Sequence, residues 1–376
     1  MSPEFRRLSE VRLININSAS LASLADVRRY SHTLGALRLA LENNLSTLGP
    51  AEHRAFLAAM IVHDAGTPAF AHLFEYFLMD KFDWDHETVL PLLLSGKHHP
   101  DEKNHQIYLS QVPQFQKLCK SARIDYEIVL DILSGTHKSS KLIFGTVDFD
   151  NIDNVARMNW MLGNRFDVKA LLSLARNIGV GGDGKFLLPI EQRPSLDLWL
   201  QLRRKAYEVL VFDGPTVAGQ AVLSRAISEA LKDHTLSNFD WHYTDSELIR
   251  IIRENSPKAK TLLDRDFFGT LPQLNMIVQI TDQKSPCWGL VRDDLASLVE
   301  RFLQEQFNER RAYGYVLRDR GTFEKHINAV DPLSGDEWEI GNRSNSLVIY
   351  GFGVKQLKFK PTVIGDRFLE WMAHTT

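Results

Sequence analysis

Leucines spaced three and four residues apart are the feature that most constrains how this chain folds. Between Arg28 and Leu48 they mark one face of a helix, at Leu34, Leu37, Leu41 and Leu45. Gly49-Pro50 then ends that helix, since neither residue suits a helix interior. The same period recurs at about 52–63, 167–178, 195–210, 216–233, 245–254 and 291–306. The sequence therefore predicts a mainly α fold.

The pattern changes beyond about residue 240. Period-two alternation in 312–317 and 347–359 predicts strands, so we divide the chain into a helical domain, 1–240, and a smaller mixed α/β region, 241–376. We expect the second region to serve oligomerisation or regulation. Its lysines alternate as in an exposed edge strand, at Lys355, Lys358 and Lys360. Its arginine cluster is typical of solvated surface, at Arg310, Arg311, Arg318 and Arg320.

Composition excludes several classes of protein. With 376 residues, 44% of them hydrophobic, the chain can bury a large core. Its 44 basic and 47 acidic residues give a net charge of −3, so no global field draws it to nucleic acid or to an anionic membrane, although a local nucleic-acid contact stays open. Two cysteines are too few for a disulfide framework, and no apolar run predicts a membrane helix. A cytoplasmic protein is expected.

His63 and Asp64 adjoin each other at the end of a predicted helix, and His63 lies on the apolar stripe of that helix. Two polar groups buried together need a strong partner. The chain offers His32 in the first turn of the preceding helix and Asp150 at the start of a later one. Taken singly, either is more typical of a helix cap or a core residue. Together, two imidazoles and two carboxylates predict a site for a divalent ion that binds a phosphate oxygen.

Further histidines follow this motif. His72 and Glu75 lie three residues apart on one predicted helix, so they either act together or form a surface pair. His86 precedes Glu87 and suits either a helix start or a site. A histidine-rich stretch is typical of a solvated loop, although it could supply a second metal, at His98, His99 and His105.

Together these motifs resemble those of the HD-domain phosphohydrolases, and within them the branch of deoxynucleoside triphosphate triphosphohydrolases. The resemblance covers about 25–255. Residues 29–36, Arg-Tyr-Ser-His-Thr-Leu-Gly-Ala, are similar to the family's Arg-x-x-His-Ser-Leu-Gly-Val. Residues 63–75 resemble His-Asp-x-Gly-His-x-Pro-Phe-x-His-x-Phe-Glu, and 148–157 resemble Asp-x-Asp-x-x-Asp-Tyr-x-x-Arg. The combination is far more specific than a lone His-Asp pair.

The resemblance implies a helical HD-domain fold around one metal ion, bound by His32, His63, Asp64 and Asp150. That ion would be Mn²⁺, Mg²⁺, Fe²⁺, Co²⁺, Ni²⁺ or Zn²⁺. The implied reaction is hydrolysis of a nucleotide, most simply a deoxynucleoside triphosphate, to nucleoside and triphosphate. By resemblance, catalysis falls to His72, Glu75 and His86, and substrate binding to Arg29, Asp153 and Arg157. Relatives often form homo-oligomers, which we expect here too.

Four places depart from the family pattern. Thr67 replaces His or Asn, Asn154 replaces Tyr, Met158 replaces Asp, and 212–215, Phe-Asp-Gly-Pro, lacks the expected Tyr and basic side chains. Because these are substrate-recognition positions, the chemistry is more firmly implied than the substrate. Two other functions stay open. One is phosphomonoester or phosphodiester hydrolysis, of a signalling nucleotide or a nucleic-acid end, and the other is nucleotide sensing or scaffolding without turnover.

Overall fold

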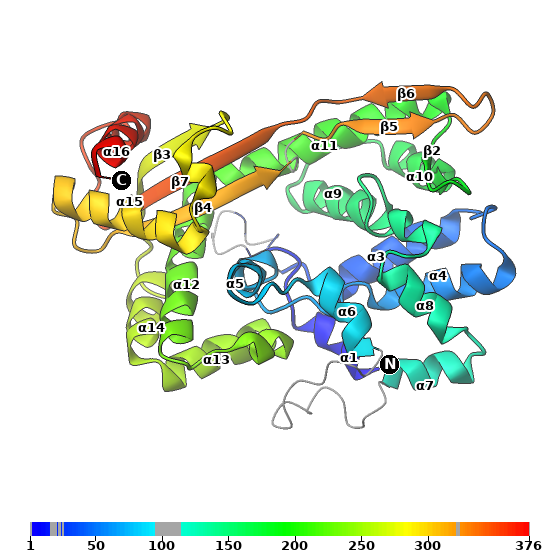
Figure 1. Cartoon of the computed structure of the whole chain (residues 1–376), viewed down its shortest axis with the longest axis horizontal. Coiled ribbons are helices and arrows are strands. Elements are labelled where there is room, and N and C mark those ends of the chain that lie inside the picture. Colours follow the sequence, from blue (N-terminus) through cyan, green and yellow to red (C-terminus); the bar gives the residue numbers. More distant parts are fainter. Residues whose placement is uncertain are drawn as a thin grey trace.

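Helices dominate the structure, a computed structural model that describes residues 2–15, 21, 24, 26–94, 114–320 and 324–375. Figure 1 shows the helices gathered around a long strand ribbon that runs along one side of the molecule. The predicted mainly α fold is confirmed. The histidine-rich stretch lies outside the described residues, so its expectation stays a prediction for His98, His99 and His105.

The first half of the described chain is helical. It contains α1 (Pro3–Arg6), α3 (Arg29–Glu42), α4 (Pro50–Val62), α5 (His72–Phe82), α6 (His86–Leu94), α7 (Gln114–Ser121), α8 (Tyr126–Leu133), α9 (Phe149–Met161) and α10 (Val168–Asn177). The second half adds α11 (Arg193–Phe212), α12 (Gly214–Lys232), α13 (Asp245–Asn255), α14 (Pro257–Leu262), α15 (Arg292–Phe307) and α16 (Pro361–Thr375).

Predicted and observed helices differ most at two ends. The helix predicted to reach Leu48 ends at Glu42, because the Asn43 side chain turns inward, accepts from Leu45 N (2.7 Å) and donates to two carbonyls of the α10 end. The helix after Pro68 begins at His72 and not at Phe70, because Phe70 and Ala71 have φ of 59° and 51°. L-residues rarely adopt this left-handed conformation.

The strands form two sheets. One has the order β1 (Gly179–Val180), β2 (Phe186–Leu187), β5 (Ile327–Val330) and β6 (Glu337–Ile340). The other places β7 (Asn345–Gly353) between β3 (Gln273–Ile280) and β4 (Tyr313–Arg320), all antiparallel. Since β7 ends at Gly353, the predicted edge-strand role is wrong for Lys355, Lys358 and Lys360, which are exposed beyond the strand.

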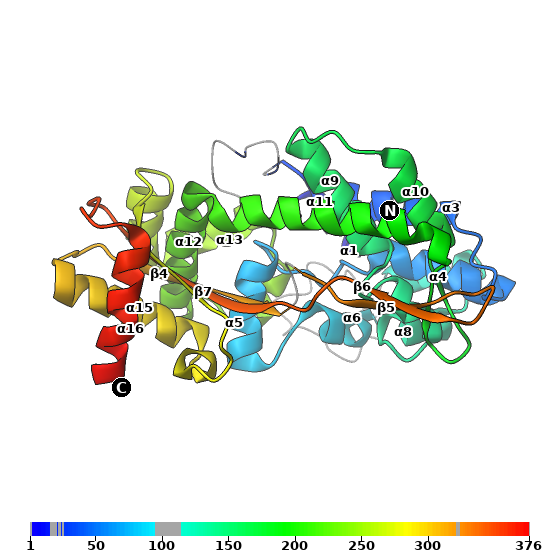
Figure 2. The ribbon, with the colours of Figure 1, turned by 90° about the horizontal axis from the view of Figure 1, so that it is seen from above.

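Two of the apolar cores contribute residues to the lining of a pocket. The first joins α3, α4, α8, α9, α10 and α11 with Ile327 and Ala329 of β5. The second joins α5, α12 and α13 with β4 and β7. Figure 2 shows α11 crossing the molecule along its long axis, from the α9–α10 end to α12. Side chains of α11 therefore reach both halves.

A third core lies under α15 and α16, which pack on the β3–β7–β4 sheet. This arrangement explains why eight of the nine residues of β7 are buried: helices cover both faces of the strand. No helix in the described part of the chain is long and apolar enough to cross a membrane.

Candidate metal and phosphate site

Four side chains from three helices converge at the centre of the molecule. His32 lies in the first turn of α3, His63 and Asp64 directly follow α4, and Asp150 lies in the first turn of α9. Asp148 caps α9 by accepting from Asn151 N (2.6 Å), which leaves Asp150 to face inward. One nitrogen or oxygen from each of the four lies within 4.8 Å of the other three.

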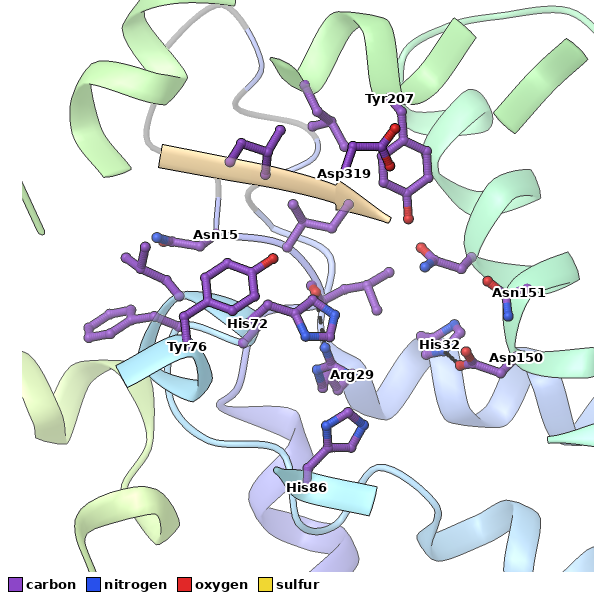
Figure 3. Close-up of a pocket in the computed structure, with 18 of the residues that line it drawn as sticks. Asn15, Arg29, His32, His72, Tyr76, His86, Asp150, Asn151, Tyr207 and Asp319 are labelled. Carbon is purple, nitrogen blue, oxygen red and sulfur yellow. Dashed lines mark hydrogen bonds and ion pairs between the residues drawn. The ribbon is translucent and has the colours of Figure 1, made fainter. Parts of the chain in front are cut away.

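Both histidines present the same nitrogen to the centre. His32 Nδ1 donates to Asp153 Oδ2 (2.7 Å), and His63 Nδ1 donates to Met60 O (2.8 Å). These bonds fix the ring orientations and leave each Nε2 directed inward. Asp150 Oδ1 lies 2.5 Å from Nε2 of His32 and 3.2 Å from Nε2 of His63. Figure 3 shows His32 and Asp150 facing each other at the wall of the pocket.

Asp64 supplies the observation that most favours a metal ion. Its Oδ1 accepts from Arg29 Nη1 and from Thr67 Oγ1. Its Oδ2 is buried and has no hydrogen-bond partner among the residues that the structure describes. That oxygen lies 3.9 Å from His32 Nε2 and 3.8 Å from His63 Nε2. A buried carboxylate oxygen without a partner is costly, and a divalent cation at this point would satisfy it.

The charges of the group agree with such a site. Burial lowers the pKa of His32, yet the carboxylates of Asp150 and Asp153 together raise it to about 10. Burial raises the pKa of Asp150, but His32 and His63 bring it well below its usual range. The group therefore attracts positive charge, carried either by a proton or by a cation. The two imidazoles and two carboxylates fit a divalent ion, whose binding would displace the proton.

Asp153 and Arg157 are placed behind the ligands and outside the pocket lining. Asp153 binds His32 Nδ1 with one oxygen, and both of its oxygens accept from Arg157 (2.9 and 3.0 Å). A Cβ atom on Gly35 would lie 1.9 Å from Asp153 Oδ1, so this glycine permits the close approach of α3 and α9. The geometry thus supports a positioning role for Asp153, and the substrate contacts of Asp153 and Arg157 stay predictions.

Asp153→Asn is expected to weaken divalent metal binding about 10- to 100-fold while the fold is retained, because the carboxylate that orients His32 is lost. Metal titration of chelator-treated protein measures this. Asp197→Asn, an exposed carboxylate on α11, is the matched control and should bind metal like the wild type. Unchanged affinity in Asp153→Asn would show that His32 is held by other contacts.

A second polar group faces the pocket from α5 and α6. Glu75, a buried residue of α5, accepts from Nδ1 of His72 with one oxygen (2.7 Å) and from Nδ1 of His86 with the other. The backbone N of His86 also donates to Glu75 (2.9 Å). The two imidazole rings are 6.0 Å apart. One carboxylate therefore orients both histidines, and His72, the more exposed of the two, presents its Nε2 to the cavity.

Burial lowers the pKa of His86, but the Glu75 carboxylate more than offsets this and raises it to about 9. Burial raises the pKa of Glu75, and the two histidines bring it well below its usual range. At neutral pH His86 is therefore a cation and Glu75 an anion. The sequence predicted this pairing for His72 and Glu75, and the structure adds His86 to the same carboxylate.

The raised pKa of His86 predicts how stability varies with pH. Since the folded-state pKa of about 9 exceeds the ordinary 6.5, the stabilisation is fully present below pH 6.5 and is lost as pH rises through 9. Relative to His86→Gln, the wild type should lose about 2 to 3 kcal/mol of unfolding free energy over that interval. Urea unfolding of chelator-treated protein at several pH values measures it. His374→Gln, at an exposed histidine, is the control. Parallel curves for wild type and His86→Gln would contradict the pairing.

The turn before His72 is held from a distant part of the chain. Phe70 and Ala71 adopt the left-handed conformation, and Phe70 N donates to Asp245 Oδ1 (2.8 Å). The other oxygen of Asp245 accepts from Arg12 N (3.2 Å). Such conformations persist only where surrounding contacts hold them. Asp245 therefore helps to fix where α5 begins and where His72 points.

A pocket of about 540 Å³ connects the two polar groups. Part of its wall is aromatic, with Tyr76 from α5 and the paired residues Tyr315 and Tyr350 from β4 and β7. On the α9–α11 side its wall includes Asn151 and Arg203, and the chain between β4 and β5 adds Lys325. None of these six residues was predicted from the sequence, because none holds a specified position in a motif. Arg318, predicted to lie on the solvated surface, also lines the pocket.

The four departures from the family pattern have different surroundings. Thr67 and Met158 are buried, and Thr67 donates to Asp64 Oδ1 (3.2 Å). Asn154 lines the pocket, and its buried Oδ1 has no hydrogen-bond partner within the described part of the chain. Phe212 is 57% exposed at the end of α11. Only Asn154 of these residues lines the pocket, so it is the departure placed to contact a substrate.

Comparison with solved structures identifies the class of fold. A phosphohydrolase from Bacteroides thetaiotaomicron is 14% identical, with a TM-score of 0.60, and the match covers 93% of each chain. A hypothetical protein from Aquifex aeolicus is 18% identical, with a TM-score of 0.62, over 93% of this chain and 90% of that one. No protein-family model and no curated protein matches the sequence.

These likenesses define a fold shared with a solved phosphohydrolase. Within that fold the described residues include a group suited to a divalent metal ion, made of His32, His63, Asp64 and Asp150.

Proposed function

We propose that this protein is a metal-dependent phosphohydrolase of the HD-domain type that acts on a nucleotide, most simply a deoxynucleoside triphosphate, to give nucleoside and triphosphate. One observation carries the proposal: the converging ligand group, with the unpartnered oxygen of Asp64, shares a pocket with the His72–Glu75–His86 group. A site for phosphate charge and a site for proton transfer thus face the same cavity.

The shape and lining of the pocket support a nucleotide. A volume of about 540 Å³ lies within the range of small-molecule sites. The aromatic end, with Tyr76, Tyr315 and Tyr350, suits a planar base. Asn154 Oδ1, an acceptor without a partner among the described residues, suits a sugar hydroxyl. The phosphate next to the sugar would then lie between His72 and the metal ligands.

The side chains that line the pocket have different roles in the proposed hydrolysis. A divalent ion held by His32, His63, Asp64 and Asp150 would supply Lewis-acid polarisation of a phosphate oxygen. His72 Nε2, oriented through Nδ1 by Glu75, is placed to move a proton between water, phosphate and leaving oxygen. Protonated His86 adds positive charge to the same wall. Arg29 Nε, buried without a partner within the described chain, is placed to contact a phosphate.

Two other functions are alternatives. Thr67 and Met158 motivate them, because both residues are buried at positions where the family pattern places substrate contacts. Phosphomonoester or phosphodiester hydrolysis would use the same ligand group on a smaller or different substrate. Nucleotide sensing would use the pocket without turnover. Homo-oligomer formation, a cytoplasmic location and the identity of the metal remain predictions.

Product analysis tests the proposal. The protein is incubated with Mn²⁺, Mg²⁺, Fe²⁺, Co²⁺, Ni²⁺ or Zn²⁺ and with deoxy- and ribonucleoside triphosphates, singly and mixed, and products are separated by chromatography. Nucleoside and triphosphate are expected. Orthophosphate or nucleoside monophosphate would instead support the phosphomonoesterase or phosphodiesterase alternative. Nucleotide binding with no product under any ion would support sensing.

A further inference from the structure

Two cations, Arg203 and Lys325, line the pocket together with the ligand group, and Asn151, which contacts Arg203, lies on the far side of Asp150 from His72 and His86 (Figure 3). Arg203 of α11 is 3% exposed, and its guanidinium lies over the rings of Tyr207 (4.5 Å) and Trp199 (5.7 Å). Its Nη1 donates to Asn151 Oδ1 (3.3 Å), and Asn151 directly follows the ligand Asp150. Figure 3 shows Asn151 beside Asp150, with Tyr207 on the adjoining wall. Arg203 is therefore fixed next to the metal-ligand group.

Lys325 reaches the same place from the C-terminal part of the chain. It lies between β4 and β5 and lines the pocket, and its Nζ donates to Thr146 O at 3.4 Å, a long contact for an ammonium group. Its backbone is set by Gly341, where a Cβ atom would lie 2.1 Å from Lys325 O. The end of the β5–β6 hairpin thus fixes the position of the lysine.

The two cations influence each other. Burial lowers the pKa of Lys325, and nearby Arg203 lowers it further, to about 8, against the opposing effect of Asp148 and Asp150. Asp148 has its own partner, because both of its oxygens accept from Asn151. Because both cations line the pocket, an anion that enters it is attracted to them.

We propose that Lys325 and Arg203 form a subsite for the second phosphate of a phosphoanhydride chain, next to the phosphate that occupies the ligand group. This deepens the proposed function and rests on it for the position of the reacting phosphate. A single phosphate at the ligand group faces His72 on one side. Its neighbour in the chain extends to the other side, where arginine offers a planar fork and lysine a point charge.

The phosphoanhydride chain bound at the subsite has two sources: a nucleoside polyphosphate is the first, and an inorganic polyphosphate is the second. Calorimetric titrations with sodium tripolyphosphate, a deoxynucleoside triphosphate, the matching monophosphate and orthophosphate distinguish them. Binding of both the nucleoside triphosphate and tripolyphosphate supports the first source, and binding of tripolyphosphate alone supports the second. Each titration is run with chelator and again with Mn²⁺, using nucleotide analogues that resist hydrolysis.

Lys325→Gln is expected to weaken tripolyphosphate binding about tenfold or more, since a hydrogen bond to a charged group is lost. Orthophosphate and monophosphate binding should change little. Lys325→Arg should keep most of the affinity, and Lys358→Gln, at an exposed lysine, should behave as the wild type. Arg203→Gln, judged alongside its melting temperature because the side chain is buried, should reproduce the loss.

Equal tripolyphosphate affinity in Lys325→Gln and wild type overturns the subsite, and so does absence of tripolyphosphate binding to the wild type under both metal conditions. Since binding is measured without turnover, failure of the proposed function can be distinguished from failure of the subsite. Lys325-dependent binding with no hydrolysis retains the subsite and rejects the enzyme. If Lys325→Gln hydrolyses the nucleotide and binds tripolyphosphate as the wild type does, the enzyme function is retained and the subsite is rejected.

Discussion

Asp64→Ala is expected to abolish divalent metal binding and to lower turnover about a thousandfold or more. The ion supplies several kcal/mol of stabilisation to the transition state, and each 1.4 kcal/mol is a factor of ten. Asp64 holds the buried oxygen that faces both imidazoles, so its removal takes away one of the four ligands. His63→Ala should behave alike. Metal content per chain and the rate of substrate loss measure the two effects.

A matched variant separates this loss from simple unfolding. Asp64→Ala also removes the partner of buried Arg29, whereas Asp64→Asn keeps an acceptor there. Asp64→Asn is therefore expected to stay folded and still lose most metal binding. Added metal should raise the melting temperature of the wild type by mass action and leave that of Asp64→Asn unchanged. Metal-dependent stabilisation in the variant would place the ion elsewhere.

The second large effect is expected at Glu75. Glu75→Gln should lower kcat about 100- to 10,000-fold, because His72 loses the carboxylate that orients it and His86 loses its counter-ion. His72→Ala should lower kcat over a similar range. Metal binding should survive in both variants, since neither residue belongs to the ligand group. Steady-state kinetics together with metal titration checks this separation.

Glu52→Gln is the control for that comparison. Glu52 accepts from His137 Nε2 (3.3 Å), so it is also a carboxylate beside a histidine, but neither residue lines the pocket. It should leave kcat unchanged. A Glu75→Gln protein with wild-type kcat would remove the histidine pair from the reaction and leave the ligand group as the sole catalytic element.

Much of the candidate site could be predicted because its ligands lie in short motifs. His63 and Asp64 are neighbours in sequence, and His32 and Asp150 each lie in the first turn of a helix that the apolar period predicts. Local spacing also indicated that His72 and Glu75 share a face. Convergence of these elements into one cluster followed from the chemistry of the four side chains and from the resemblance, and not from periodicity, since the spacing within a helix does not say which helices pack together.

The rest of the site depends on long-range packing. Arg203 and Lys325 have no motif around them, and Tyr315 enters the pocket only because β4 pairs with β7 and packs on α12. Asp153 was predicted as a substrate contact and binds His32 Nδ1, and its position one turn after Asp150 suits either role. The left-handed turn at Phe70 depends on Asp245, which is 175 positions away.

The most direct test measures metal content and products on the same samples. Chelator-treated wild type and Asp64→Asn are titrated with Mn²⁺, dialysed, analysed for metal per chain, and assayed by chromatography against a mixture of deoxynucleoside triphosphates. We predict about one ion per wild-type chain, hydrolysis that appears with that ion, and neither in Asp64→Asn. Full turnover by metal-free Asp64→Asn would contradict a metal-dependent site at these four residues.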